Sequence, residues 1–175
     1  MHQRPEIDPK FARVDRLVLL MGSNVGKREE YLERALFRAV DLLGPPTLSS
    51  RIWETAAWGG VAHDSFLNQA HSFVSHLDPF DLLQSLKGIE QQIGRRATER
   101  WGNREIDIDI LVYGSQCVND SRLQIPHPRL ADRRFALIPL AEVAPEWRHP
   151  TSGQSAAELL AVCTDEASVR LHQHT

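Results

Sequence analysis

Residues 100–110 of the chain read RWGNREIDIDI, and they carry the strongest structural and chemical signal in the sequence. The second half of this stretch alternates acidic and apolar side chains, a period of two that is typical of a β-strand. Asp107 and Asp109 then point to one face, and the neighbouring isoleucines point to the other. Two carboxylates on one rigid face can share a metal ion, and such hard oxygen ligands suit Mg²⁺ bound to substrate phosphates.

Four arginines close to this strand supply positive charge for a polyphosphate. They are Arg95, Arg96, Arg100 and Arg104. Their guanidinium groups match phosphate oxygens with paired hydrogen bonds. Taken alone, an acid pair can be the solvated face of an amphipathic strand, and arginine runs are commonly solvated. The combination of acids and arginines favours a site for a metal-bound polyphosphate.

The rest of the sequence predicts the elements around this strand. Apolar spacing, N-capping residues and the breakers Gly44 and Gly94 define their limits. The expected strands are residues 17–21, 48–54 and 68–77, the acidic strand to residue 113 and a short strand near residue 123; the expected helices are 32–43, 79–93, 135–143 and 156–162. A loop over residues 55–65 contains two glycines and is a plausible substrate-facing segment.

The order strand, helix, strand, strand, helix, strand is that of a ferredoxin-like fold. We therefore predict an α+β class protein, an αβ sandwich whose mainly antiparallel sheet has helices packed on one face. With 175 residues and 42% hydrophobic content, the chain fits one buried core. Residues 15–175 are predicted to form this single domain, and residues 1–14, which are polar and contain two prolines, a flexible N-terminal arm.

Composition excludes several classes of protein. A net charge of −3 argues against a general nucleic-acid or membrane-surface binder. No apolar run approaches the length of a membrane span or of a signal peptide core. Cys117 and Cys163 have neither a disulfide framework nor a metal-binding spacing, which favours a reducing cytoplasm. We expect a cytoplasmic monomer that binds neither nucleic acid nor membrane.

Six motifs, in this order, resemble 6-hydroxymethyl-7,8-dihydropterin pyrophosphokinase of folate biosynthesis. They are GSN (22–24), ETAAWGG (54–60), FLNQA (66–70), GIEQQIGRR (88–96), RWGNREIDIDIL (100–111) and IPHPRLADRRF (125–135). The resemblance runs from about residue 17 to residue 150, and several ordered motifs are more specific than any single one. It implies transfer of the β,γ-pyrophosphoryl group of MgATP to the hydroxymethyl oxygen of the pterin, with release of AMP.

The resemblance also implies roles for individual residues. Asp107 and Asp109 match the ligands of two Mg²⁺ ions, and with Arg95 and Arg104 they form the catalytic set. The implied ATP contacts are Lys87, Glu90, Arg95, Trp101, Arg104, Ile110, His127 and Arg133. The implied pterin contacts are Thr55, Trp58, Phe66, Asn68, Trp101 and Phe135, with two phenylalanine rings on either side of the pterin and Asn68 reading its amide-like edge.

Each of these residues also has an ordinary interpretation. Phe66 and Phe135 are of a type usually found in the core. Glu90 on a helix is commonly a solvated partner of Lys87, three residues away. His127, between two prolines, is compatible with simple turn packing. The sequence context, rather than residue type, supports the functional roles.

The chain departs from the family pattern at three positions. Ala97 replaces an arginine, so one nucleotide contact is lost or shifted to Arg96. Asn103 replaces a proline, which is expected to loosen the segment before the acidic strand by freeing φ. Phe66 stands where some members have tyrosine, and it keeps the ring while losing a hydroxyl.

Three alternative interpretations fit parts of the sequence. Residues 22–28, GSNVGKR, lack one residue between the glycines of a P-loop and end in Arg28 instead of Ser or Thr, which rejects a Walker-type site. An RNA-binding ferredoxin-like module would use the arginines and exposed aromatics of the sheet, but the two aspartates oppose it. A degenerate relative without catalysis would fit Ala97 and Asn103, but not retention of both acids, Arg95 and Arg104.

Overall fold

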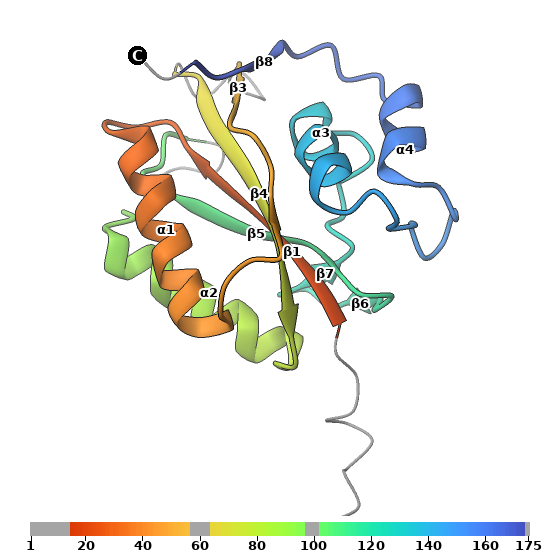
Figure 1. The fold of residues 1–175 in the computed structure, drawn as a ribbon, viewed down its shortest axis with the longest axis horizontal. Coiled ribbons are helices and arrows are strands. Elements are labelled where there is room, and N and C mark those ends of the chain that lie inside the picture. The colour runs from red at the N-terminus through yellow and green to blue at the C-terminus, as the bar shows by residue number, and fades with distance from the viewer. Residues whose placement is uncertain (1–14, 57–63, 97–101, 174–175) are drawn as a thin grey trace, which may run out of the picture.

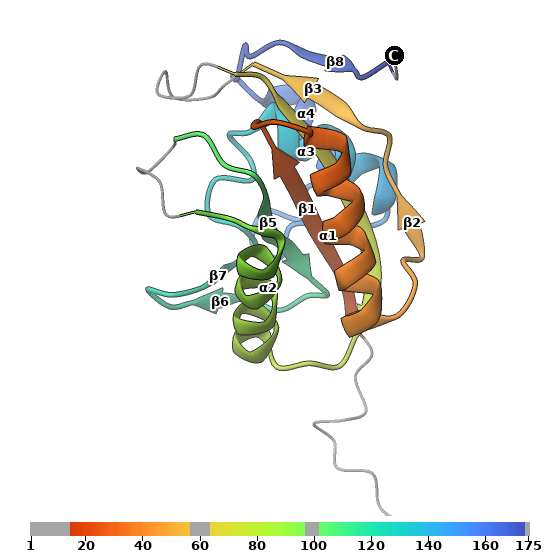
Figure 2. The same ribbon diagram turned by 90° about the vertical axis from the view of Figure 1, so that its left-hand side faces the viewer.

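A computed structural model describes residues 15–56, 64–96 and 102–173. The predicted arm, residues 1–14, lies outside the described residues. Figures 1 and 2 show the arrangement of the elements. They are β1 (Asp15–Ser23), α1 (Arg28–Leu43), β2 (Leu48–Ser49), β3 (Trp53–Thr55), β4 (Phe66–Ser75), α2 (Pro79–Ile93), β5 (Asp107–Tyr113), β6 (Val118–Asn119), β7 (Gln124–Ile125), α3 (Arg134–Val143), α4 (Ala156–Val162) and β8 (Val169–Leu171).

The main sheet has the strand order β5-β1-β4-β3-β8, and β2 also pairs with β4. Every pairing in this sheet is antiparallel. Elements β1, α1, β3, β4, α2 and β5 follow the predicted order, so the predicted ferredoxin-like class is confirmed. β1 and β4 lie at the centre of the sheet and pair from Asp15↔Ser75 to Ser23↔Leu67. This central ladder brings the C-terminal end of β1 beside the beginning of β4.

Helices cover both faces of the sheet, whereas the sequence predicted helices on one face. On the first face, Leu17, Leu19 and Met21 of β1 pack in one core with α1 and α2. Val18 and Leu20 point to the opposite face and pack with α3 and α4. In Figures 1 and 2 the two helix pairs lie on opposite sides of the sheet. β1 is apolar at every position from 17 to 21 because it is covered on both faces.

The two predicted helices that pack on the first face, α1 and α2, are confirmed. Asp78 accepts a 2.8 Å hydrogen bond from Phe80 N, Pro79 occupies the first turn of α2, and Gly94 ends the helix with a φ of 110°. α1 ends at Leu43, before Gly44, whose φ is 80°. None of the helices in the described part of the chain is long and apolar enough to cross a membrane.

The edge of the sheet beside β3 differs from the prediction. Residues 48–54 form two short strands rather than one, because Ser50 Oγ accepts the hydrogen bond from Ala70 N, at 2.9 Å, and so interrupts the ladder. The predicted strand 68–77 lies two residues earlier, as β4. β8 was not predicted at all. It pairs with β3, where Ala56 N donates to Ser168 O at 3.2 Å.

An ion-pair network ties β8 to the sheet. Glu54 of β3 pairs with Arg28 at the start of α1, at 2.9 Å, and with Arg170 of β8, at 2.8 Å. Arg28 also donates to Ser65 O at 2.8 Å. The C-terminal strand therefore holds in place the strand that ends at Thr55.

Candidate active site

One pocket brings together most of the residues predicted to bind pterin or metal. It lies where the ends of β1, β3, β4 and β5 meet the start of α3. Its lining includes the predicted residues Thr55, Phe66, Asn68, Arg104, Asp107, Asp109, Arg133 and Phe135, together with Leu20, Gly22 and Ala56. These residues come from five separate parts of the sequence, and the fold alone brings them together.

The alternation of β5 places both acids in this pocket, as the sequence predicted. Ile106, Ile108 and Ile110 pack in the core beneath α1 and α2. Asp107 and Asp109 therefore face the opposite side of the sheet, where they line the pocket. The register of β5 shifts against β1 between Val18 and Leu19, which marks a bulge beyond the two acids.

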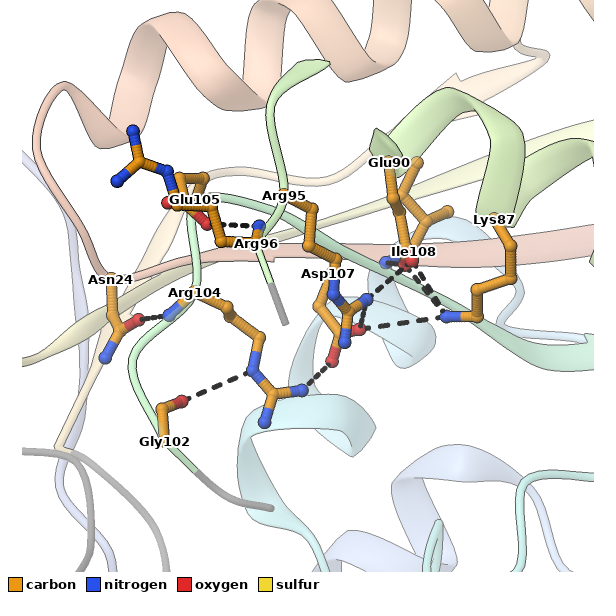
Figure 3. Close-up of polar contacts among 10 residues, drawn as sticks. All are labelled: Asn24, Lys87, Glu90, Arg95, Arg96, Gly102, Arg104, Glu105, Asp107 and Ile108. Carbon is orange, nitrogen blue, oxygen red and sulfur yellow. Dashed lines mark hydrogen bonds and ion pairs between the residues drawn. The ribbon is translucent and has the colours of Figure 1, made fainter. Parts of the chain in front are cut away.

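Asp107 is surrounded by cations. Its two carboxylate oxygens pair with the guanidinium groups of Arg95 and Arg104, and Lys87 Nζ lies 4.0 Å away. Figure 3 shows Asp107 between the two arginines. Burial opposes ionisation, but the charges of Arg104, Arg95 and Lys87 outweigh it and hold the pKa of Asp107 below its usual value. Asp107 is therefore ionised at neutral pH.

Asp109 has a different environment although it is only two residues away. Among the described residues it has no hydrogen-bond or ion-pair partner. Burial, and then the negative charge of Asp107, raise the pKa of Asp109 to about 7. Its oxygens thus accept no hydrogen bond within the described residues and lie next to an ionised carboxylate, a combination that suits a hard divalent cation.

Glu90 supports this site from α2. It is 1% exposed, and its carboxylate accepts a 2.7 Å hydrogen bond from Ile108 N on the outer edge of β5. The same carboxylate pairs with Lys87 Nζ at 2.9 Å and with Arg95 at 2.6 Å. Burial raises the pKa of Glu90, partly offset by the charge of Lys87. Glu90 is thus a partner of Lys87, and it is buried rather than solvated.

The GSN motif shapes the end of the pocket that contains Asn68 and Thr55. Asn68 Nδ2 donates a 2.9 Å hydrogen bond to Thr55 Oγ1, and both residues are buried. A Cβ atom at Gly22 would lie 2.9 Å from Asn68 Oδ1, closer than such contacts allow. A larger residue at position 22 would therefore force the Asn68 amide, which is held by Thr55, to shift.

Arg133 joins the pocket from the loop before α3. Its guanidinium carbon lies 5.5 Å from the ring centroid of Phe135, and its Nη1 lies 3.5 Å from His127 Nε2. Burial and the neighbouring charge of Arg133 lower the pKa of His127 to about 4. His127 is therefore neutral at physiological pH, and since its Nδ1 accepts a 3.2 Å hydrogen bond from Arg129 N, Nε2 is the ring nitrogen left for a ligand.

A second pocket adjoins the first and shares Asp109 with it. The predicted ATP residues Lys87, Ile110 and His127 line it, with residues 120–124 of the β6–β7 connection. Sequence reasoning missed Arg122 there, whose guanidinium lies 4.7 Å from the ring centroid of Phe80 and pairs with Asp120 at 3.0 Å. The only sequence signal for Arg122 and its neighbours is their position just before the IPHP motif, which begins at residue 125.

The remaining predictions concern the segments before β4 and β5. Trp58, Ala97 and Trp101 lie outside the described residues. On either side of residues 97–101, Arg96 N donates to Glu105 Oε2 at 3.2 Å, and Arg104 N donates to Asn24 Oδ1 at 2.7 Å (Figure 3). Asn103, expected to loosen this segment, has a side-chain contact that sequence did not predict: its Oδ1 accepts from Asn24 Nδ2 at 2.9 Å.

The donor set fits a cation shared with a substrate rather than a closed structural site. Within the described residues, no group of three or more His, Cys, Asp or Glu side chains is placed to hold a metal ion. Asp107 and Asp109 would therefore supply two ligands and leave the other positions to substrate oxygens and water. Mg²⁺ is commonly bound in this way when it accompanies phosphates.

Comparisons with known proteins agree with this geometry. Residues 18–145 match the family model of 7,8-dihydro-6-hydroxymethylpterin-pyrophosphokinase. A 2-amino-4-hydroxy-6-hydroxymethyldihydropteridine pyrophosphokinase of Bacillus subtilis is 34% identical over 163 residues, which cover 90% of this chain and 95% of that protein. One of the same name from Synechocystis is 34% identical over 143 residues, covering 82% and 73% of the two chains.

Solved structures support the same fold. The crystal structure of Plasmodium falciparum HPPK-DHPS aligns with 85% of this chain at a TM-score of 0.67 and 15% identity, and this chain spans 44% of the length of that one. At that identity the likeness concerns the fold alone, whereas the family model and the curated relatives cover most of the sequence. The chain therefore belongs to the 7,8-dihydro-6-hydroxymethylpterin-pyrophosphokinase family.

Proposed function

We propose that this protein transfers the terminal diphosphate of MgATP to the hydroxymethyl group of 6-hydroxymethyl-7,8-dihydropterin, releasing AMP, in folate biosynthesis. One observation carries the proposal: Asp109 lines both pockets, and Asp107 lies beside it among three cations. A nucleotide in one pocket and a pterin in the other would meet at the two aspartates. Family membership supports the same two substrates.

The pterin would occupy the pocket that contains Asn68 and Thr55. Phe66 and Phe135 both line this pocket and can stack on a bicyclic ring, while the amide of Asn68 offers a donor and an acceptor to its edge. Trp58 and Trp101 remain proposed pterin contacts, the latter also an ATP contact, on the strength of the motifs alone.

The triphosphate would lie along the cations between the pockets. Arg95, Arg104 and Arg133 are proposed phosphate contacts, and Lys87, Ile110 and His127 line the pocket proposed for the rest of the nucleotide. Glu90, proposed from sequence as a nucleotide contact, already has its carboxylate engaged by Ile108 N, Lys87 and Arg95. We therefore propose that Glu90 contributes mainly by orienting these two cations.

Two Mg²⁺ ions are proposed to bind at Asp107 and Asp109 together with the nucleotide. When bound, they would neutralise phosphate charge and favour ionisation of the attacking hydroxyl. The chain's own contribution is to hold the hydroxyl and the β-phosphorus in line and to place Arg95 and Arg104 where negative charge increases. No covalent intermediate is required, and no general base is assigned.

We further propose that the protein acts as a monomer in the cytoplasm and binds neither nucleic acid nor membrane. The two cysteines are both free, as expected for a reducing compartment. An RNA-binding module of this fold would need an open sheet face for base stacking, but helices cover both faces of this sheet.

The assay for the proposed function supplies MgATP and reduced 6-hydroxymethylpterin and measures both products. We expect AMP and diphosphorylated pterin to appear in equal amounts, and AMP formation to depend on the pterin. Formation of ADP in place of AMP, or no turnover that depends on pterin, would overturn the proposal.

A further inference from the structure

Three segments that border the pocket meet at one buried amide. Asn24, which follows β1, is 2% exposed. Its Oδ1 accepts a 2.7 Å hydrogen bond from Arg104 N, and its own N–H donates to Arg104 O at 3.2 Å. Its Nδ2 donates to Asn103 Oδ1 at 2.9 Å and to Asp64 O at 3.4 Å. Asn24 thus contacts the chain just before β4 and just before β5.

Asn103 links the same segments a second time. Its Nδ2 donates to Asp64 Oδ2 at 3.4 Å, while its Oδ1 accepts from Asn24. Both ends of the Asn103 amide are therefore used, one on each neighbouring segment. We call Asn24, Asp64 and Asn103 the amide cluster.

The amide cluster holds the backbone of Arg104, which is not held by the hydrogen bonds of the sheet. β5 begins at Asp107, so the backbone of Arg104 lies outside the strand. Its N–H and C=O both bond to Asn24, and its side chain pairs with Asp107 in the pocket. A guanidinium group binds an anion well only when its backbone is held in place. The orientation of the Arg104 side chain therefore depends on the amide cluster.

We propose that Asn103 is a positioning residue for Arg104, acting through its two-sided amide contact with Asn24 and Asp64. The proposal deepens the proposed function, because Arg104 is taken there as a phosphate contact. Asn103 lines neither of the two pockets proposed for the substrates. It keeps the Asn24 side chain oriented so that Asn24 Oδ1 stays on Arg104 N.

The first experiment uses the full chain and needs no activity. Asn103→Ala should speed hydrogen exchange of the Arg104 amide about three- to tenfold, the effect of one lost hydrogen bond. Thr47→Ala serves as the matched control, because it deletes a side-chain hydrogen bond to Ser72 O, of 3.1 Å, at the other end of β4. Unchanged exchange of Arg104 in Asn103→Ala would overturn the proposal, whatever the outcome of the enzyme assay.

The second experiment measures the dissociation constant of a non-hydrolysable ATP analogue with Mg²⁺. Asn103→Ala should raise it about three- to tenfold in the wild-type background, and add nothing in an Arg104→Ala background, since residues acting through one group are not additive. Asp64→Asn, which keeps an acceptor for Asn103, should bind as wild type, whereas Asp64→Ala should resemble Asn103→Ala. Equal effects of Asn103→Ala in both backgrounds would contradict the proposal.

Discussion

The buried carboxylate of Glu90 accepts the backbone N–H of Ile108 at 2.7 Å, so a side chain of α2 occupies the open edge of the strand that carries both aspartates. An edge strand otherwise presents unpaired backbone groups to solvent. Glu90 satisfies one of them and also holds Lys87 and Arg95. One acid therefore links the edge of the sheet to the cations of the site.

Glu90→Ala should lower the free energy of unfolding by about 2 kcal/mol, because a buried N–H loses its acceptor and two cations lose a partner. Glu90→Gln keeps an acceptor for Ile108 N and should recover part of that loss. Denaturant unfolding measures both variants. A Glu90→Ala protein as stable as the wild type would show that Ile108 N finds another partner.

Asp107→Ala should reduce AMP formation by at least about a hundredfold while the protein stays folded, since Asp107 faces the pocket rather than a core. Asp41→Ala, which removes an exposed acid of α1 that pairs with Arg38, is the control and should retain wild-type turnover. The pterin-dependent assay under saturating MgATP compares the two. Wild-type turnover in Asp107→Ala would refute the metal-ligand assignment.

Gly22→Ala should raise KM for the pterin about tenfold, because the added methyl group would meet Asn68 Oδ1 at 2.9 Å and push that amide from its place. Binding of the ATP analogue should change little. Gly88→Ala is the matched control: nothing lies within 4 Å of its Cβ position, and alanine should stabilise α2 by about 0.5–1 kcal/mol. An unchanged pterin KM in Gly22→Ala would place the pterin elsewhere.

His71 should make the protein less stable as the pH falls from 6.5 to 4. Burial lowers the pKa of His71 from 6.5 to about 4, so in this interval the unfolded chain binds the proton and the folded chain does not. The full effect is about 3 kcal/mol. His71→Asn should remove this contribution, so its unfolding free energy should fall less than that of the wild type over this interval; His127 acts in the same direction as His71, and Asp109, whose pKa is raised to about 7, acts in the opposite direction. An identical slope in the variant would contradict the burial argument.

Much of the fold could be predicted because it depends on local signals. Asp78, Pro79 and Gly94 mark both ends of α2, and the alternation at residues 106–110 gives the faces of β5. β8 could not be predicted in this way, since three residues show no clear period and their pairing with β3 depends on the tertiary fold. Helices α3 and α4 were predicted individually, but the expectation that all helices pack on one face was wrong, because no local signal indicates which face of the sheet a helix covers.

The candidate site, too, could be predicted only in part. The motifs identified the residues of the pocket, but the contacts between residues in the structure show what several of them do. Glu90 lies four residues after Leu86 and three before Ile93, on the apolar face of α2, but its residue type favoured a solvated side chain. Asn24 and Asn103 are 79 residues apart, so their contact could not be derived from either local segment.

The matched family region ends at residue 145, yet β8 braces the strand that leads into Thr55. A protein that ends just before β8 would keep both aspartates, all the cations around them, and helix α4 with the core in which it packs. It would still lose the outer neighbour of β3, and with it the Arg170 partner of Glu54. Forms without β8 should therefore bind nucleotide normally and bind the pterin poorly. The part of the chain that a family model matches need not include every segment that supports the binding pocket.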